Sequence, residues 1–425
     1  MKHIQTLLLS TVLIGGSAAC SPTSIAQAPP LAPAFDTAAM DAMLSEAVES
    51  GEVIGVQALV FDEGQTVYRG MYGLGDRERN VPVAEDTVYR VYSMTKPMTA
   101  ALIMDLIEEG KLNLSDPASK YVPQLANMKV ASLDANGVPQ YADQARPMTI
   151  EDLLLHRAGL AYGIFGVGPI EQAYQKAGLF NSKETVADQM DKLGALPLLG
   201  QPGEQWFYSF SIDVLGVIAE IVTEQTLGEA LQARFLGPLG MTETSFQVRP
   251  DQKPRFVSNY LLQEDGSYIL ADDGQTSDYT TGHKYESGGG GLVSTTDDWL
   301  KFARMLLNEG EYEGTRILEP ETVRLMMQDH VGSDTPYLLP WLGGETGAGF
   351  GYGGSVQMTT TPEQEAERGR YPGQFGWGGA ARTNFWIDPE NDAIGIIMLQ
   401  FFGGDDPEIH DRFQAMALEE TRDDR

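Results

Sequence analysis

The stretch YRVYSMTKPMTA at residues 89–100 decides the fold, because it sets Ser93 three residues before Lys96 at the start of an apolar helical pattern. Residues spaced i and i+3 share a helix face, so the Lys96 amine can reach the Ser93 hydroxyl. The first N–H groups of the helix favour an oxyanion at the serine. Burial lowers the pKa of a lysine, which lets it activate a serine. A two-residue pattern also occurs by coincidence on surfaces, so further motifs are required.

Three more motifs follow in order along the chain. They are PGEQWFYSFS at residues 202–211, GGGLVSTTDD at residues 289–298 and GWGGA at residues 376–380. With residues 89–100 they resemble the motifs of the serine β-lactamase-like superfamily, which includes class C β-lactamases, DD-peptidases and family VIII carboxylesterases. The Trp-Gly-Gly form of the last motif is most similar to the family VIII esterases. The resemblance covers the chain from about residue 36 to residue 402.

The resemblance implies a role for each matching residue. Ser93 would be the acylated nucleophile, and Lys96 and Tyr208 would share proton transfer. The oxyanion hole would consist of the backbone N–H groups of Ser93 and Ala380. The substrate-binding residues that it implies are Trp377, Gly378, Gly379 and Phe210. His156 matches a histidine that we interpret as structural, bonded to nearby backbone.

Two departures from the family pattern bear on the substrate. Trp377 stands where β-lactamases carry the lysine of Lys-Thr-Gly, and Phe210 replaces the asparagine of Tyr-Ser-Asn. Both changes remove polar contacts that would recognise a β-lactam substrate, and they favour an uncharged ester. We therefore predict a serine esterase of family VIII type acting on a small-molecule ester. The alternatives are a β-lactamase or peptidoglycan DD-peptidase, and a non-catalytic envelope binding protein that retains the fold.

Composition excludes other classes of function. The 425 residues carry 29 Lys and Arg against 60 Asp and Glu, which gives a formal charge of −31. So acidic a surface repels phosphate backbones, and we expect no nucleic-acid partner. No G-x-S-x-G nucleophile elbow and no H-E-x-x-H motif occurs, and the five histidines are scattered. We expect no metal and no other cofactor.

The amino terminus has the pattern of an export signal. Lys2 and His3 precede an apolar run at residues 7–14 and small residues that end at Cys20. We predict a signal peptide at residues 1–19, lipidation of Cys20, a tether at residues 20–35 and one catalytic domain at residues 36–425. The protein would then be exported, as a periplasmic or membrane-anchored lipoprotein of a bacterial envelope. Ordinary cleavage after Ala28 is the alternative, and it would remove the cysteine.

Hydrophobic periodicity predicts the elements of this domain. Helical spacing is found near residues 37–48, 98–110, 214–222, 297–307 and 407–418, and strand-like runs lie at residues 53–61, 66–72, 381–387 and 393–402. The segment at residues 263–291, rich in Gly and Asp, is predicted to be irregular. We expect an α/β (α+β) fold of the β-lactamase/DD-peptidase type. Its mostly antiparallel sheet would come from both termini, with flanking helices and an inserted, mainly helical lobe.

Overall fold

The computed structural model describes residues 35–179, 181–332, 335, 337, 346–404 and 408–423. Residues 35–425 form one compact unit. The predicted export signal, Cys20 and all but the last residue of the predicted tether lie outside the described residues. None of the helices within the described ranges has the length and apolar content needed to span a lipid bilayer.

The main sheet has eight strands in the order β12-β13-β14-β15-β16-β1-β2-β3, and its neighbours are antiparallel. The amino-terminal hairpin pairs directly with the carboxy-terminal strands, with Leu59 opposite Ile396. This confirms the predicted sheet built from both termini. The strands are β1 (Gly55–Asp62), β2 (Gln65–Asp76), β3 (Val81–Pro82), β12 (Ala348–Phe350), β13 (Ser355–Gln357), β14 (Phe375–Gly378), β15 (Asn384–Asp388) and β16 (Ala393–Met398).

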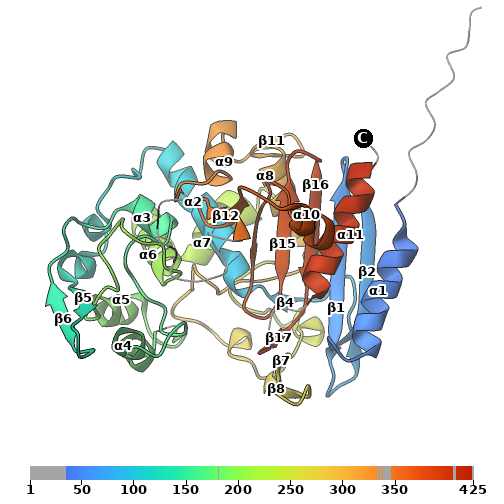
Figure 1. The fold of residues 1–425 in the computed structure, drawn as a ribbon, viewed down its shortest axis with the longest axis horizontal. Helices are drawn as coiled ribbons and strands as arrows, with labels where there is room; N and C mark the ends of the chain where they lie inside the picture. Colours follow the sequence, from blue (N-terminus) through green and yellow to red (C-terminus); the bar gives the residue numbers. More distant parts are fainter. Residues whose placement is uncertain are drawn as a thin grey trace, which may run out of the picture. The chain divides into compact units, whose positions relative to one another are not determined.

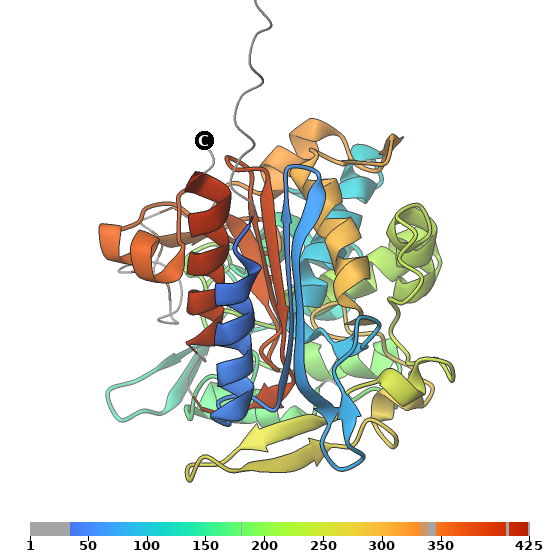
Figure 2. The ribbon, with the colours of Figure 1, turned by 90° about the vertical axis from the view of Figure 1, so that its right-hand side faces the viewer.

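Helices cover both faces of the sheet because its side chains alternate (Figure 2). On one face, Val60 and Ile397 join a core with α1 (Thr37–Glu49) and α11 (Ile409–Asp423). On the other face, Leu59 and Ile396 belong to the larger core that includes α8 (Thr296–Leu307). Helix α10 (Pro362–Arg368) lies beside α11.

In the sequence, the helical lobe lies between the amino-terminal and the carboxy-terminal strands of the sheet. In space, it lies beside the sheet (Figure 1). Its central helices are α2 (Thr95–Glu108) and α6 (Ser211–Thr223), which pack on each other. Both are buried along most of their length, so they form a rigid base for the residues at their amino-terminal ends. The remaining helices of this part are α3 (Ile150–Leu154), α4 (Pro169–Ala177), α5 (Val186–Gly194), α7 (Leu227–Leu231) and α9 (Pro320–Met326).

Four small sheets complete the described structure, and one of them corrects a prediction. The segment at residues 263–291 is not wholly irregular, because β8 (Tyr268–Asp272) pairs with β7 (Asn259–Leu262). In the turn between them, Gly266 has a φ of 82°. The turn is rich in polar residues, which is why the sequence predicted an irregular segment instead of a hairpin. The other small strands are β4 (Tyr89–Arg90), β5 (Val130–Leu133), β6 (Pro139–Ala142), β9 (Val293–Ser294), β10 (Glu311–Tyr312), β11 (Thr315–Arg316) and β17 (Phe401–Phe402).

The two predicted carboxy-terminal strands are shorter than their apolar runs. Strand β15 begins at Asn384 because the residues before it form a turn, in which Arg382 has a φ of 68°. The run at residues 393–402 divides into β16 and β17. Between them, buried Gln400 accepts a hydrogen bond from the Arg90 N–H at 2.9 Å, and Phe401 then pairs with β7 in a different sheet. Tertiary contacts therefore set these strand ends.

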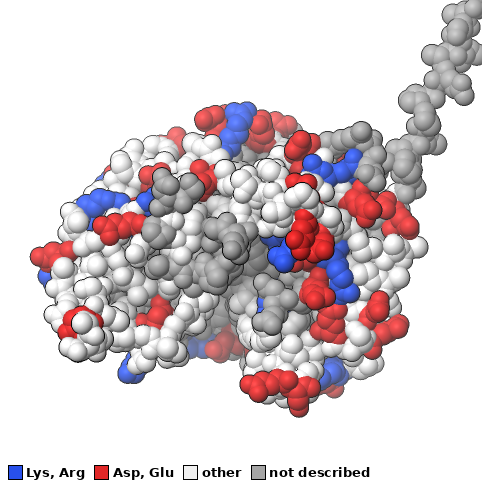
Figure 3. Space-filling view, viewed as in Figure 1, with Lys and Arg blue, Asp and Glu red and all other residues white. Residues whose placement is uncertain are grey.

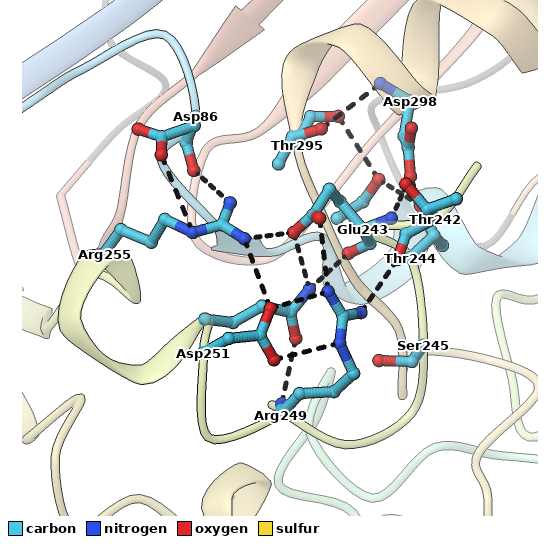
Figure 4. A network of polar contacts seen from close by, with 12 residues as sticks. Asp86, Thr242, Glu243, Thr244, Ser245, Arg249, Asp251, Arg255, Thr295 and Asp298 are labelled. Atoms are coloured by element: carbon cyan, nitrogen blue, oxygen red, sulfur yellow. Dashed lines mark hydrogen bonds and ion pairs between the residues drawn. The ribbon is translucent and has the colours of Figure 1, made fainter. Parts of the chain in front are cut away.

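A polar network fixes the start of the segment that leads to Ser93 (Figure 4). Arg255 donates to the backbone oxygen of Asp86, in the turn before β4, at 2.7 Å and forms an ion pair with Glu243. The Glu243 N–H donates to Asp298 in the first turn of α8 at 2.7 Å. The network therefore ties the middle of the chain to the strand that carries the nucleophile segment.

Candidate active site

Ser93 lies in a short helical turn, Tyr92–Met94, directly before α2. Tyr92 has a φ of 42°, a left-handed conformation that costs energy in a residue other than glycine. Neighbours hold it there: its ring packs against Tyr279 and Phe402, and its hydroxyl accepts a hydrogen bond from Asn259 Nδ2 at 3.1 Å. This strained residue turns the chain so that Ser93 lines a cavity.

Lys96 is fully buried beside the Ser93 hydroxyl. Its Nζ lies 3.1 Å from Ser93 Oγ, 2.5 Å from the Gly289 carbonyl oxygen and 3.3 Å from the Tyr162 hydroxyl. Burial lowers the pKa of Lys96 to about 7, although the nearby carboxylate of Asp213 acts in the opposite direction. Near neutral pH the amine is thus able to accept a proton from the serine.

Tyr208 lies next to Ser93 and Lys96, in the loop before α6. Its hydroxyl accepts a hydrogen bond from Trp377 Nε1 at 3.2 Å and also bonds to Ser93. Burial raises the pKa of Tyr208 above its usual value, while the hydrogen bonds with Ser93 and Trp377 lower it. The ring stacks on Tyr162 with centroids 5.3 Å apart, and Lys96 Nζ lies 4.6 Å from its centre. The structure therefore brings Ser93, Lys96 and Tyr208 together.

The end of β14 forms the opposite wall. Ala380 lines the cavity with Ser93, and its N–H makes no hydrogen bond within the described part of the chain, as an oxyanion donor requires. A Cβ atom on Gly379 would lie 2.4 Å from the Val91 carbonyl oxygen. Because of this contact, the protein's own backbone requires a glycine at position 379. Glycine at position 379 therefore allows the chain just after β14, including Ala380, to approach the segment that carries Ser93.

Phe210 is placed differently from the expectation. It is fully buried at the amino-terminal end of α6, its N–H donates to the Ala161 carbonyl at 3.1 Å, and it is not among the described residues that line the cavity. Its ring packs edge-on against Tyr162, with centroids 6.4 Å apart. The structure assigns Phe210 to the core instead of to substrate contact. Trp377, Gly378 and Gly379 do line the cavity.

His156 is structural, as its context suggested. Its Nδ1 accepts a hydrogen bond from the Ser209 N–H at 3.2 Å, and its ring lies 4.8 Å from the ring of Tyr208. Burial, with a contribution from the charge of Lys96, lowers the pKa of His156 well below its usual value. The neutral ring therefore supports the backbone beside Tyr208.

Sequence reasoning missed two groups that surround Lys96, namely Tyr162 and Asp213. Asp213 is fully buried on α6 and accepts hydrogen bonds from the Tyr285 hydroxyl at 2.8 Å and from Ser287 Oγ at 2.5 Å. Burial raises the pKa of Asp213, whereas Lys96 and the donors lower it. A carboxylate inside the apolar run of α6 was the available signal, because such a group needs buried partners.

The cavity in front of Ser93 has a volume of about 1660 Å³. Tyr162, Phe165 and Tyr279 line it on the side of the lobe, and Ile164 is 65% exposed at its rim. Its lining also includes Ala380 and Gln374, and its volume leaves room for groups on both sides of a bond held at Ser93. In Figure 3, basic side chains on this face mostly lie beside acidic ones. Within the described ranges, no three metal-ligating side chains cluster together.

The sheet with its inserted helical lobe defines the β-lactamase and penicillin-binding-protein class of folds. The chain belongs to the Beta-lactamase family, whose family model matches residues 40–419.

The chain is similar to several named proteins over most of its length. Protein Rv1367c of Mycobacterium tuberculosis (strain ATCC 25618 / H37Rv) is 36% identical over 363 residues, which cover 84% of this chain and 88% of that protein. Esterase EstB of Burkholderia gladioli is 28% identical over 386 residues, with coverages of 85% and 89%. A solved structure described as EstCE1, a hydrolase with promiscuous acyltransferase activity, superimposes with a TM-score of 0.69. It is 27% identical and covers 90% of this chain and 96% of its own.

Proposed function

We propose that this protein is a serine esterase of family VIII type. The observation that carries the proposal is the pairing of Ser93 with a buried lysine beside a phenol whose other partner is the neutral indole of Trp377. Trp377 itself thus offers no cation to a substrate carboxylate, which favours an uncharged ester beside it. The names of EstB and EstCE1 support ester chemistry.

Acylation would begin with attack of Ser93 Oγ on the ester carbonyl carbon. The serine proton passes to neutral Lys96, directly or through Tyr208, and the oxyanion accepts hydrogen bonds from the N–H groups of Ser93 and Ala380. When the C–O bond breaks, the same proton returns to the leaving alcohol. Water then attacks the acyl-enzyme, gives its proton to the same base and releases the carboxylic acid. The proton then returns to Ser93.

Hydrolysis of p-nitrophenyl butyrate tests the proposal, with Ser93→Ala as the variant. We expect that Ser93→Ala abolishes turnover, retains the circular dichroism of the folded protein and no longer gains the acyl mass in intact-mass spectrometry. Ser182 also lines the cavity, so Ser182→Ala is the matched control and should keep its activity. Turnover by Ser93→Ala at the wild-type rate would refute the proposal.

Three other probes distinguish the alternative functions. Turnover of nitrocefin faster than that of the ester would indicate a β-lactamase, and labelling by fluorescent penicillin would indicate a DD-peptidase. A fluorophosphonate probe that fails to label Ser93 would indicate a non-catalytic binding protein.

Acyl transfer to an alcohol is a second candidate, which the size of the cavity favours. About 1660 Å³ exceeds what a short ester fills, so an alcohol can occupy the site with the acyl group. The description of EstCE1 names such an activity for that protein. Incubation with vinyl butyrate and a primary alcohol in water tests it: the butyrate ester of the alcohol should form faster than butyric acid. Formation of the acid alone would leave hydrolysis as the function.

We also propose that Cys20 anchors the protein to the bacterial envelope through a lipid. The small residues before the cysteine support this, as does the Pro- and Ala-rich stretch that follows it. Labelled palmitate should be incorporated by the wild type and not by Cys20→Ser, which should appear in the soluble fraction. A wild-type protein that is soluble and unlabelled would indicate ordinary cleavage after Ala28.

A further inference from the structure

We propose that Asp213 is a positioning residue that holds the Gly289 carbonyl against the Lys96 amine and so keeps that amine directed at Ser93. The inference rests on the proposed function, because it assigns a residue to the same proton transfer. It concerns how the lysine is oriented in a chain where Phe210 replaces the asparagine of the family pattern.

The carboxylate of Asp213 holds the segment at residues 285–289 through hydrogen bonds. Its Oδ1 accepts hydrogen bonds from the Tyr285 hydroxyl, from Ser287 Oγ and from the Gly289 N–H at 3.2 Å. Three donors from five consecutive residues converge on one oxygen. A fully buried carboxylate on α6 therefore fixes the path of this segment.

The carbonyl of Gly289, in that segment, also contacts the lysine. Lys96 Nζ donates to the Gly289 oxygen at 2.5 Å and to the Tyr162 hydroxyl at 3.3 Å. A neutral amine has two N–H groups and one lone pair. When both N–H groups donate to these acceptors, the lone pair is available to accept the proton of Ser93, whose Oγ lies 3.1 Å from Nζ. A backbone carbonyl and a tyrosine thus supply the orientation.

The glycine at position 289 is a requirement of this arrangement. A Cβ atom there would lie 2.1 Å from Asp213 Oδ2, a distance at which the loop or the carboxylate must move. Within the described residues, Asp213 Oδ2 has no hydrogen-bond partner, so the contact with Gly289 is one of close packing. Any larger residue would separate Asp213 from the segment that it holds.

The charge of Asp213 also acts on the lysine. The groups that face the pair are Tyr162, from the loop after α3; Tyr208; Tyr285; and the His156 ring, at the end of α3. Burial raises the pKa of each tyrosine and lowers that of His156, so these groups are neutral near pH 7. Asp213 is the nearby charge that raises the pKa of Lys96 against burial. Removing that charge must lower the pKa of the amine further.

Asp213→Asn is the first test, read by the rate of Ser93 labelling with a fluorophosphonate as a function of pH. Asparagine keeps the volume and one acceptor oxygen. We expect the labelling rate at its optimum to fall about 10–100-fold, the usual cost of a misplaced reacting group. The acidic limb of the profile should shift to lower pH. A purely structural role would reduce the amplitude and leave the limb in place, and that result would overturn the proposal.

Asp76→Asn is the matched control, because Asp76 at the end of β2 is a buried carboxylate that also accepts several hydrogen bonds, among them those from the Arg79 N–H and from Ser258 Oγ, each at 2.9 Å. It should keep both the rate and the limb of the wild type. If wild-type Ser93 is not labelled at all, the proposed function fails before the role of Asp213 is tested.

Gly289→Ala is the second test and removes no charge. The added methyl group should displace the carbonyl from Lys96 and slow labelling about 10–100-fold, with the protein still folded by circular dichroism. Wild-type labelling by folded Gly289→Ala would contradict the proposal. This variant also serves if Asp213→Asn fails to fold.

Discussion

The indole N–H of Trp377 donates a hydrogen bond to the phenol oxygen of Tyr208 across 3.2 Å. This phenol oxygen, to which we assign a proton exchange with Ser93, is thus held from the sheet by an uncharged donor, and the Tyr208 ring lies beside Lys96 of the lobe. A neutral donor lowers the pKa of the phenol less than a cation at this place would. Under the proposed function, this relationship ties the identity of residue 377 to the transfer of the serine proton.

Replacing the indole tests that relationship. Trp377→Phe removes the donor, so the pKa of Tyr208 should rise and kcat/KM for p-nitrophenyl butyrate should fall about tenfold, the cost of one hydrogen bond to a charged state. Trp299→Phe is the control, because Trp299 is buried on α8 and its Nε1 has no partner among the described residues. Equal activity losses in the two variants would show that the indole N–H has no specific role.

The pH dependence of the wild type follows from Lys96. Because burial lowers the pKa of this lysine to about 7 and only the neutral amine accepts the serine proton, kcat/KM should rise from about pH 6 to about pH 8. Burial raises the pKa of Glu220 to about 7 as well, so Glu220→Gln is the control. The acidic limb should persist in that variant. Its disappearance would assign the limb to Glu220.

Local spacing was enough to predict which groups lie together at the cavity. Ser93 and Lys96 are three residues apart, and Tyr208 follows a recognisable Pro-Gly turn, so the sequence alone indicated this cluster. The order of strand-like and helical runs likewise predicted the sheet built from both termini and the inserted lobe. These features depend on short-range pattern and on the order of motifs.

Contacts between distant segments escaped prediction. The Gly289 carbonyl reaches Lys96 over a separation of 193 residues, and the hydroxyl of Tyr162 over 66 residues. The apolar run of α6 indicates that Asp213 needs buried partners, but the local pattern does not indicate which residues they are. The same holds for Phe210, whose place in a motif suggested substrate contact, while packing against Tyr162 buries it.

The close approach of β14 to the nucleophile segment yields a further prediction. Gly379→Ala places a methyl group 2.4 Å from the Val91 carbonyl, which must displace the Ala380 N–H. We expect kcat/KM to fall about 100-fold or more, the effect of losing an oxyanion donor. Gly282→Ala is the control, because a Cβ atom there meets no heavy atom within 4 Å. Full activity of Gly379→Ala would refute the oxyanion role of Ala380.

The rim of the cavity should select for apolar chains. Ile164 is 65% exposed where the cavity opens, and a long acyl or alkyl chain would cover it. Ile164→Asn should lower kcat/KM for p-nitrophenyl octanoate about fivefold, or about 1 kcal/mol of apolar contact, and leave the acetate unchanged. Val138 is 51% exposed away from the cavity, and Val138→Asn should change neither substrate. Equal losses for both esters would contradict this role.

Lys96 should also limit the stability of the protein. Its pKa falls from 10.5 to about 7 on folding because burial disfavours the charge. Between these values the unfolded chain binds one proton more than the folded chain, so stability rises with pH in that window. Lys96→Met removes the buried ionisable amine and should stabilise the fold by about 1–4 kcal/mol at neutral pH while abolishing turnover.

Urea unfolding at several pH values measures this gain in stability, which must shrink as the pH approaches the ordinary pKa of a lysine. A gain independent of pH, or a loss of stability at pH 7, would show that Lys96 carries no such cost and would contradict its role as a buried base.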